Sequence, residues 1–287
     1  MIDFLIETRL REENPDLHRR TKESALVLQK MLESFIPRFP NYTDHTMLHS
    51  MDVIEYGNML IGEEQVKRLS AAECYVLIMS CYLHDIGMGI SQKNYESFSE
   101  KIDFGNYFDT HSRENTDDII RDFHNEYSGL FIRKYAGIFD IPCEEMVFAI
   151  IQVSRGHRKT DLFDGIEYRD LTTPYGVIRT AYLAAVIRLA DEIDVGADRN
   201  SELLFDSSKV QVELSKEAFG THESILNVEV REDVIVLHTK PKEPKYRKLI
   251  CDLADKIRKT LDYCREVAEK RSDFRINQTD VVITEVE

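Results

Sequence analysis

Apolar residues recur with helical spacing through most of the first 200 positions. In residues 15–38 and 115–135 they repeat about every 3.6 positions, which predicts amphipathic helices. Residues 71–84 and 177–194 are apolar on nearly every side, a pattern typical of helices that are buried all round. With a further short helix near residues 144–153, these segments predict an all-helical body.

The pattern changes to short β-rich runs after about residue 200. SILNVEV and VIVLHTK are separated by a short turn that contains Arg231 and Glu232, which predicts a β-hairpin. A charged amphipathic helix is expected over residues 245–270, and DVVITEV at 280–286 is expected to add a third strand. The predicted fold class is therefore mainly α, a helical bundle with a small C-terminal α+β appendage.

The segment at residues 91–114 shows no clean period, and its polar residues are interleaved with Tyr and Phe. Such a segment predicts a long loop, of the kind that often forms a lid or a binding loop. Taken together, these patterns divide the chain into a helical domain over residues 1–200 and an appendage over residues 201–287, consisting of the hairpin and the amphipathic helix.

The chain is acidic, with 37 Lys and Arg against 52 Asp and Glu and a formal net charge of −15. An acidic surface repels phosphate backbones, so nucleic acid is left open as a partner but is not favoured. The five cysteines are scattered and form no CxxC pair, as expected in a reducing compartment. No signal peptide and no uncharged run of membrane-spanning length is recognised. We therefore expect a cytoplasmic protein that is not bound to a membrane.

Histidines and aspartates lie on the apolar helices, at their ends or just beyond them. A lone buried histidine is more often a satisfied core residue than a ligand, but an ordered set of them is a stronger signal. Imidazoles suit a divalent transition metal, and carboxylates can bridge two ions. Asp191 would lie near a helix C-terminus, where the helix dipole opposes an acid and favours a cation partner. The candidate ligands are His49, His84, Asp85, His124, His157 and Asp191.

Four of these residues carry a resemblance to a known family. His49 in HTMLHSMDV, the pair His84-Asp85 in YLHDIGMG and Asp191 in VIRLADEID follow the order H…HD…D, which resembles the HD-domain metal-dependent phosphohydrolases. The resemblance covers roughly residues 20–200 and implies an HD-domain helical bundle in which these four residues bind one divalent ion. A looser resemblance is to the HD modules found beside chaperone-like ATPase domains in bacteria.

The same resemblance implies a second ion. Family members with two metals have further histidines between the HD pair and the last Asp, and His124 and His157 occupy that interval. On this interpretation Asp85 bridges the ions. Several such members have paired histidines where this chain has Gly156-His157-Arg158, so one or two ions both stay open. The expected cofactor is Mn, Fe, Ni, Co or Zn, with Mg as a further candidate.

Basic residues beside the expected ligands are candidates for binding phosphate, because guanidinium groups make bidentate phosphate contacts. Arg155, Arg158 and Lys159 flank His157, although a solvated basic turn is an equally good interpretation. Arg121 and His45 are expected at the substrate pocket, each near one helical turn before a candidate ligand. The residues predicted to act in catalysis are Asp85, Arg158 and Lys159, and Asp52 is a candidate to orient a ligand histidine.

The predicted function is a metal-dependent phosphohydrolase that uses a metal-activated water to cleave a phosphate ester or phosphodiester of a nucleotide or nucleotide-derived signal. The expected partner is thus a small phosphorylated substrate. Two alternatives stay open: a two-metal HD single-strand nuclease, and a metal-binding regulatory module without turnover. In the latter, the appendage, which includes the basic stretch KPKEPKYRK, would mediate a homo-oligomer or dock a protein partner.

Overall fold

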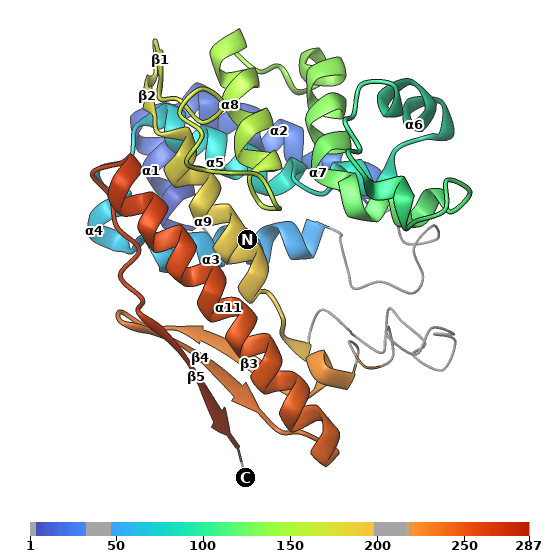
Figure 1. The fold of residues 1–287 in the computed structure, drawn as a ribbon. Coiled ribbons are helices and arrows are strands. Elements are labelled where there is room, and N and C mark those ends of the chain that lie inside the picture. Colours follow the sequence, from blue (N-terminus) through green and yellow to red (C-terminus); the bar gives the residue numbers. More distant parts are fainter. Residues whose placement is uncertain (1–3, 33–46, 198–216, 218–219, 287) are drawn as a thin grey trace.

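The computed structural model describes residues 4–32, 47–197, 217 and 220–286, and it confirms the mainly α class with a small C-terminal α+β part (Figure 1). His45, predicted as a substrate contact, lies outside the described residues. Within those residues no single helix has the length and apolar character needed to cross a membrane, although the bent pair Ala71–Gly89 and Gln92–Ser99 passes that test together.

The body is built around two buried helices, α5 and α9. Every residue of α5 is buried, and α5 packs against α1, α2, α3, α8 and α9. The helices of the body are α1 (Leu5–Glu13), α2 (Pro15–Leu32), α3 (Met47–Ile61), α4 (Glu63–Val66), α5 (Ala71–Leu83), α6 (Gln92–Ser99), α7 (Thr116–Tyr135), α8 (Glu144–Arg155) and α9 (Thr180–Ile193). Three 3-10 turns and a small hairpin complete it: η1 (Ile86–Gly89), η2 (Tyr107–Asp109), η3 (Ala136–Phe139), β1 (Leu171–Thr173) and β2 (Gly176–Ile178).

The start of α5 is fixed by a capping box. The Ser70 hydroxyl accepts a hydrogen bond from the Glu73 amide (3.1 Å), and the Glu73 carboxylate accepts one from the Ser70 amide (2.9 Å). Glu73 is fully buried and also pairs with Arg179 at the start of α9 (2.7 Å). The cap therefore sets the relative positions of the two central helices at one end of the body.

Replacing Ser70 with alanine is expected to lower the free energy of unfolding by about 1–2 kcal/mol, because the buried end of α5 loses its cap. The same change removes the bond from the Ser70 hydroxyl to the Val177 carbonyl (2.7 Å). Urea denaturation followed by circular dichroism measures the effect. An unchanged midpoint would contradict this account of the helix start.

The prediction of a long loop over residues 91–114 is wrong in its first third, because Gln92–Ser99 form α6. The Ser91 side chain caps this helix by accepting a hydrogen bond from the Asn94 amide (3.3 Å). Asn94 and Phe98, one turn apart, are both buried, which stabilises a helix whose polar residues dilute the apolar period. The remaining residues, 100–115, form a connection that contains only η2.

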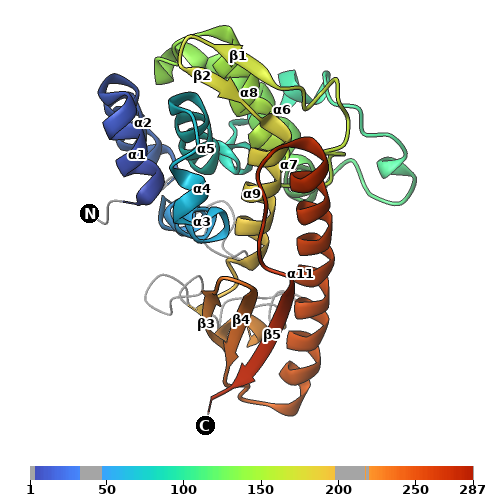
Figure 2. The same ribbon diagram turned by 90° about the vertical axis from the view of Figure 1, so that its left-hand side faces the viewer.

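The predicted hairpin, third strand and charged helix are all present in the C-terminal part. Strands β3 (Ile225–Val230) and β4 (Val234–Thr239) pair antiparallel, and β5 (Asp280–Glu285) pairs parallel with β4 after α11 (Pro244–Arg271). The sheet order is β3-β4-β5. Figure 2 shows α11 running from this sheet along the helical body, where it packs against α9. The proposed boundary at residues 200 and 201 lies outside the described residues and stays a prediction.

Candidate metal centre

Five separate segments of the body each bring a histidine or an aspartate to one point between the helices. All six predicted ligands meet there, although they come from distant parts of the chain. They are His49 on α3, His84 and Asp85 between α5 and η1, His124 on α7, His157 just after α8, and Asp191 in the last turn of α9.

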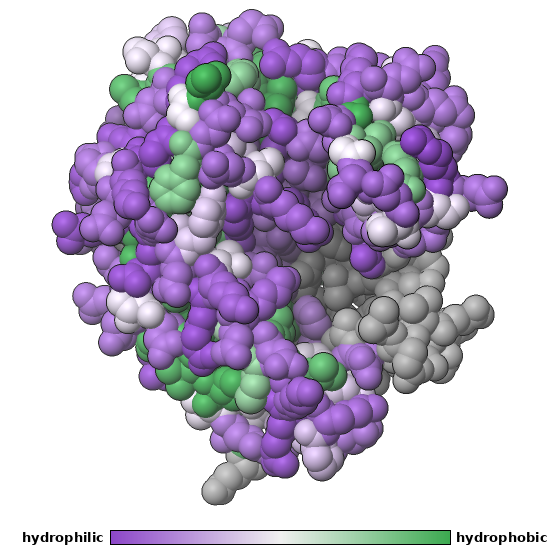
Figure 3. All heavy atoms as spheres, in the orientation of Figure 1, coloured by the Kyte–Doolittle hydropathy of each residue, from purple (hydrophilic) through white to green (hydrophobic). Residues whose placement is uncertain are grey.

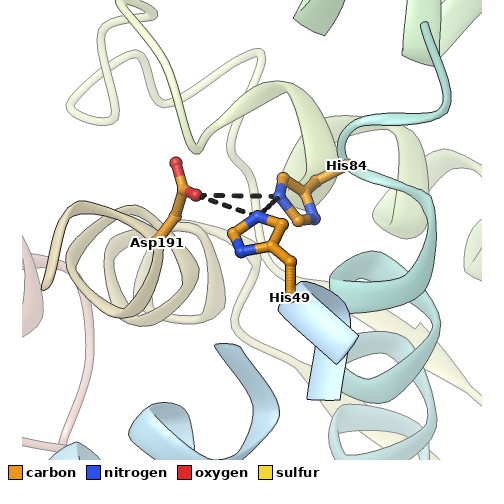
Figure 4. A group of neighbouring side chains, drawn as sticks. All are labelled: His49, His84 and Asp191. Carbon is orange, nitrogen blue, oxygen red and sulfur yellow. Dashed lines mark hydrogen bonds and ion pairs between the residues drawn. The ribbon is translucent and has the colours of Figure 1, made fainter. Parts of the chain in front are cut away.

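Three of these side chains form a first group that could hold a metal ion, namely His49, His84 and Asp191. Figure 4 shows the two imidazole rings and the carboxylate pointing toward one another. The two Nε2 atoms lie 3.1 Å apart, and Asp191 Oδ1 lies 3.3 Å from His49 Nε2 and 3.8 Å from His84 Nε2. Two imidazoles and one carboxylate are a donor set that suits a divalent transition metal.

A second group lies directly beside the first and consists of Asp85, His124 and His157. The Nε2 atoms of its two histidines are 2.8 Å apart, and the rings of His84 and His157 meet edge to face with centroids 4.9 Å apart. In each group the ligand atoms lie within 4.8 Å of one another. The structure therefore contains two adjacent donor sets of the same chemical type.

Asp85 faces both groups with different oxygen atoms. Its Oδ2 lies 3.3 Å from His84 Nε2 and 3.5 Å from His49 Nε2. Its Oδ1 lies 3.2 Å from His124 Nε2 and 3.6 Å from His157 Nε2. This placement is what a carboxylate that bridges two metal ions requires.

Each of the four histidine rings is oriented by a hydrogen bond of Nδ1, while Nε2 faces the centre. His49 Nδ1 bonds to Asp194 Oδ2 (2.6 Å). The other three rings use Nδ1 to reach the backbone carbonyl three residues earlier: His84 to Cys81 (2.8 Å), His124 to Arg121 (2.6 Å) and His157 to Ser154 (2.5 Å). A proton fixed on Nδ1 leaves Nε2 free as a ligand, so all four rings present the correct nitrogen to the centre.

Asp194 is a site residue that the sequence analysis missed. It lies three residues after Asp191, is almost fully buried, and accepts the His49 hydrogen bond for which Asp52 had been a candidate. Asp52 instead lines a cavity between α3 and β3. The signal in the sequence was the spacing in DEID, which puts both aspartates near one face of the end of α9.

Replacing Asp194 with alanine is expected to weaken the binding of a metal ion at the first group by about 10–100-fold, because the His49 ring loses the acceptor that orients it. Isothermal titration with Mn²⁺ measures the change. The Asp194→Asn variant retains an oxygen acceptor and is expected to recover part of the affinity. Equal affinities in all three proteins would show that Asp194 does not position His49.

Burial and the surrounding charges favour the ligand forms of two of the candidate ligands, Asp191 and His157. Although burial alone raises the pKa of the Asp191 carboxyl, its contact with His49 and the neighbouring imidazoles hold that pKa well below its usual value. Burial, followed by the nearby His84 and His124, holds the pKa of His157 well below its usual value. An ionised carboxylate and a neutral imidazole are the forms that bind a metal, so the donor chemistry fits such an ion.

Solvent reaches the centre from one side. The Asp191 side chain is 21% exposed, whereas the side chains of the other five ligands are at most 7% exposed. The face of the molecule seen in Figure 3 is largely hydrophilic, and it is hollowed between the α8–α9 region and the lobe that carries α6 (Figure 1). A small polar molecule would therefore approach from the Asp191 side.

The turn after the HD pair is clamped against α7. The Gly87 amide donates to the Ser128 hydroxyl (2.8 Å), which in turn donates to the His84 carbonyl (2.6 Å). A Cβ atom at Gly87 would lie 2.2 Å from the His124 carbonyl oxygen and 2.7 Å from the Ser128 amide nitrogen. Only glycine allows this close approach, which connects the HD pair to the helix that carries His124.

Of the predicted phosphate contacts, Arg155 already has acidic partners. Its guanidinium makes two bonds to the Glu126 carboxylate (2.8 and 3.0 Å) and another to Glu167. Burial opposes its charge, but these partners raise the pKa of Arg155 above its ordinary value. Arg155 therefore connects α8 to α7 and to the following loop, and a role in binding substrate would require these bonds to open.

The other predicted basic residues lie closer to solvent. Lys159 is exposed, Arg121 is half exposed and close to Asp122 (3.5 Å), and Arg158 is half-buried. The positive charge of Arg158 acts on Glu192, the neighbour of Asp191, and opposes the burial that raises the pKa of Glu192. The roles of Lys159, Arg121 and Arg158 all stay predictions.

Arg188 is a second residue that the sequence analysis did not identify. Its guanidinium donates to the Gly156 carbonyl and to the Thr160 carbonyl, both at 2.7 Å. These bonds fix the turn that carries His157 on the surface of α9. A charged residue in a buried helix was the available signal, because it requires partners.

Comparison with models of known protein families identifies the family of the chain. The model of a family described as HD-CE matches residues 39–273, which include all six candidate ligands. No curated protein and no solved structure matches the chain.

Proposed function

Since the chain belongs to the HD-CE family, an HD-type domain, and carries two donor groups joined by one aspartate, we propose that it is a metal-dependent phosphohydrolase. Its substrate would be a small phosphate ester or phosphodiester, such as a nucleotide or nucleotide-derived signal. The observation that carries the proposal is the position of Asp85, with one oxygen toward each group.

The donor set supports this chemistry. A divalent ion supplies charge neutralisation for phosphoryl oxygens and lowers the pKa of bound water. His49, His84, Asp85 and Asp191 would hold one ion, and Asp85, His124 and His157 the other. Among the described ligand residues Asp191 is the most exposed, so we expect a phosphate group to approach on its side of the centre.

Positive charge near the open side supports a phosphorylated substrate. Glu192, next to Asp191, pairs with Lys256 of α11 (2.7 Å). Burial raises the pKa of Glu192, and the charges of Lys256 and Arg158 oppose that rise. Lys256 therefore lies beside the residue that follows Asp191, in a chain whose net charge is −15. An anionic substrate that displaces Glu192 from these cations would gain charge-assisted hydrogen bonds.

A metal analysis followed by a hydrolysis panel tests the proposal. The purified protein is analysed for bound metal, stripped, and reloaded separately with Mn, Fe, Co, Ni, Zn and Mg. Each form is assayed with a phosphomonoester, a phosphodiester, nucleotides and labelled single-stranded RNA and DNA. We expect bound metal and turnover of a small ester that disappears on stripping and returns on reloading.

The other outcomes favour the alternatives. Degradation of the single strands with no turnover of the small esters would favour a nuclease. Bound metal without turnover of any substrate would favour a regulatory module. Protein without affinity for any of these metals would overturn both the proposed hydrolase and the metal centre.

A further inference from the structure

Aromatic side chains in the connection after α6 pack against α7 next to the metal centre. Phe104 and Tyr107 each meet the Phe123 ring edge to face, with centroids 4.8 Å and 5.0 Å apart. The Tyr107 hydroxyl also donates to the Asp122 carboxylate (2.9 Å). We call Phe104, Tyr107 and Phe123 the aromatic cluster. The two residues of the connection, Phe104 and Tyr107, thus contact two successive residues of α7, Asp122 and Phe123.

These contacts lie where α7 is kinked. Phe123 has φ −120° and ψ 16°, which are not helical values, although the helix continues on both sides. Helices rarely bend without an identifiable cause such as proline or an inserted side chain, and residues 116–135 contain no proline. At this bend the His124 side chain takes up the Arg121 carbonyl, and the packing of Phe123 against two rings of the connection holds the bent backbone in place. The backbone is thus bent immediately before the ligand His124.

The kink determines where the His124 ring points. At this bend His124 Nδ1 reaches the Arg121 carbonyl (2.6 Å), and Nε2 faces Asp85 Oδ1 (3.2 Å) and His157 Nε2 (2.8 Å). On the opposite side, the His124 carbonyl lies against Gly87. The helix is therefore held at the kink by η1 on one side and by the aromatic cluster on the other.

We propose that Phe104 and Tyr107 are positioning residues that set the occupancy of the second metal group through the kink at Phe123. This inference rests on the proposed metal centre. The proposed reaction gives no role to the connection after α6. The inference gives this connection the role of orienting one ligand, His124. The other two residues of that group are held by contacts that do not involve Phe104 or Tyr107: His157 by the Arg188-anchored turn, and Asp85 at the start of η1, which the Gly87–Ser128 bond fixes.

Loosening the aromatic cluster is expected to affect only the second donor group, because the ligands of the first group are held by other contacts. Loosening the cluster releases His124 but leaves the first group intact, because His49 is held by Asp194 and His84 by the Cys81 carbonyl. A ligand that loses its orientation weakens metal binding by about 10–100-fold. Removal of the cluster should thus convert a two-ion site into a one-ion site.

Titration with Mn²⁺ tests this inference, with free Mn²⁺ counted by electron paramagnetic resonance. We expect two tight ions in the unaltered protein. In Tyr107→Phe and Phe104→Ala, one ion should be retained at full affinity and the other weakened about 10–100-fold. The matched control is Tyr135→Phe, which also removes a tyrosine hydroxyl bond on α7 (to Asn94, 3.2 Å), but far from the kink. It should leave both ions unchanged.

A His124→Ala background separates positioning from general damage. His124→Ala should lose the second ion by itself, and adding Phe104→Ala should not change the affinity of the remaining ion. Two unaffected ions in both cluster variants would overturn the inference alone, as would equal weakening of both ions. One ion in the unaltered protein would also overturn it but would leave a one-metal hydrolase. No ion at all would overturn the proposed metal centre as well.

Discussion

Replacing Asp85 with alanine is expected to remove both metal ions and to lower hydrolysis by about 10³-fold or more. Asp85 is the residue whose two oxygens face the two donor groups. Without it, each group loses a negatively charged donor, and four imidazoles and Asp191 remain. Metal catalysis contributes several kcal/mol of transition-state stabilisation, and each 1.36 kcal/mol corresponds to about a tenfold change in rate.

Metal content and turnover of the Asp85→Ala protein measure this effect. Asp252→Ala is a suitable control, since Asp252 is an exposed carboxylate on α11. Its replacement removes the same charge at a position away from the centre. It should retain both ions and full turnover. An Asp85→Ala protein that kept two ions would refute the bridging role. One that lost both ions but hydrolysed substrate at the normal rate would refute metal-dependent catalysis.

Replacing Gly87 with alanine is expected to have the largest effect on stability, lowering the free energy of unfolding by about 3 kcal/mol, the upper end of the usual range for an overpacked site. The added Cβ would lie 2.2 Å from the His124 carbonyl oxygen, a backbone atom that cannot swing aside as a side-chain end can. Either η1 or α7 must move, and that movement would separate Asp85 from His124.

Urea denaturation measures the loss of stability, and Mn²⁺ titration measures the accompanying loss of the second ion. Gly137→Ala provides the control, because a Cβ atom there would contact nothing within 4 Å. It is expected to be neutral or slightly stabilising. If Gly87→Ala were as stable as Gly137→Ala, the close packing of η1 on α7 would not be required by the fold.

The sequence predicts those helices and strands whose conformation follows from the pattern of their own residues. The buried helices α5 and α9 are apolar on nearly every side, and β3 and β4 have the short β-rich pattern of a hairpin, so these elements are found as predicted. The metal ligands are also recognisable, since the order H…HD…D is a property of the chain itself. The family match then supports the recognition of an HD domain.

What the sequence could not provide are contacts decided by packing. Arg155 looked available for phosphate because Glu126 and Glu167 lie 29 and 12 residues away from it. Asp194 was passed over because the spacing in DEID places it near Asp191 but does not show that Asp194, and not Asp52, faces His49. The helix α6 was missed because its stability comes from the cap at Ser91 and from burial of Phe98, not from a long apolar period.

The arrangement of ligands along the chain has a consequence for folding. His49 and its partner Asp194 are 145 residues apart, and the remaining ligands are distributed over the helices between them. A partly folded chain cannot assemble such a centre, so a metal ion would bind the native state and not the unfolded chain. Ions present at a hundred times their dissociation constant would then stabilise the fold by about 2.7 kcal/mol. A bound ion would thus stabilise the whole helical body. Its occupancy would show whether the helices that carry the ligands have reached their native arrangement.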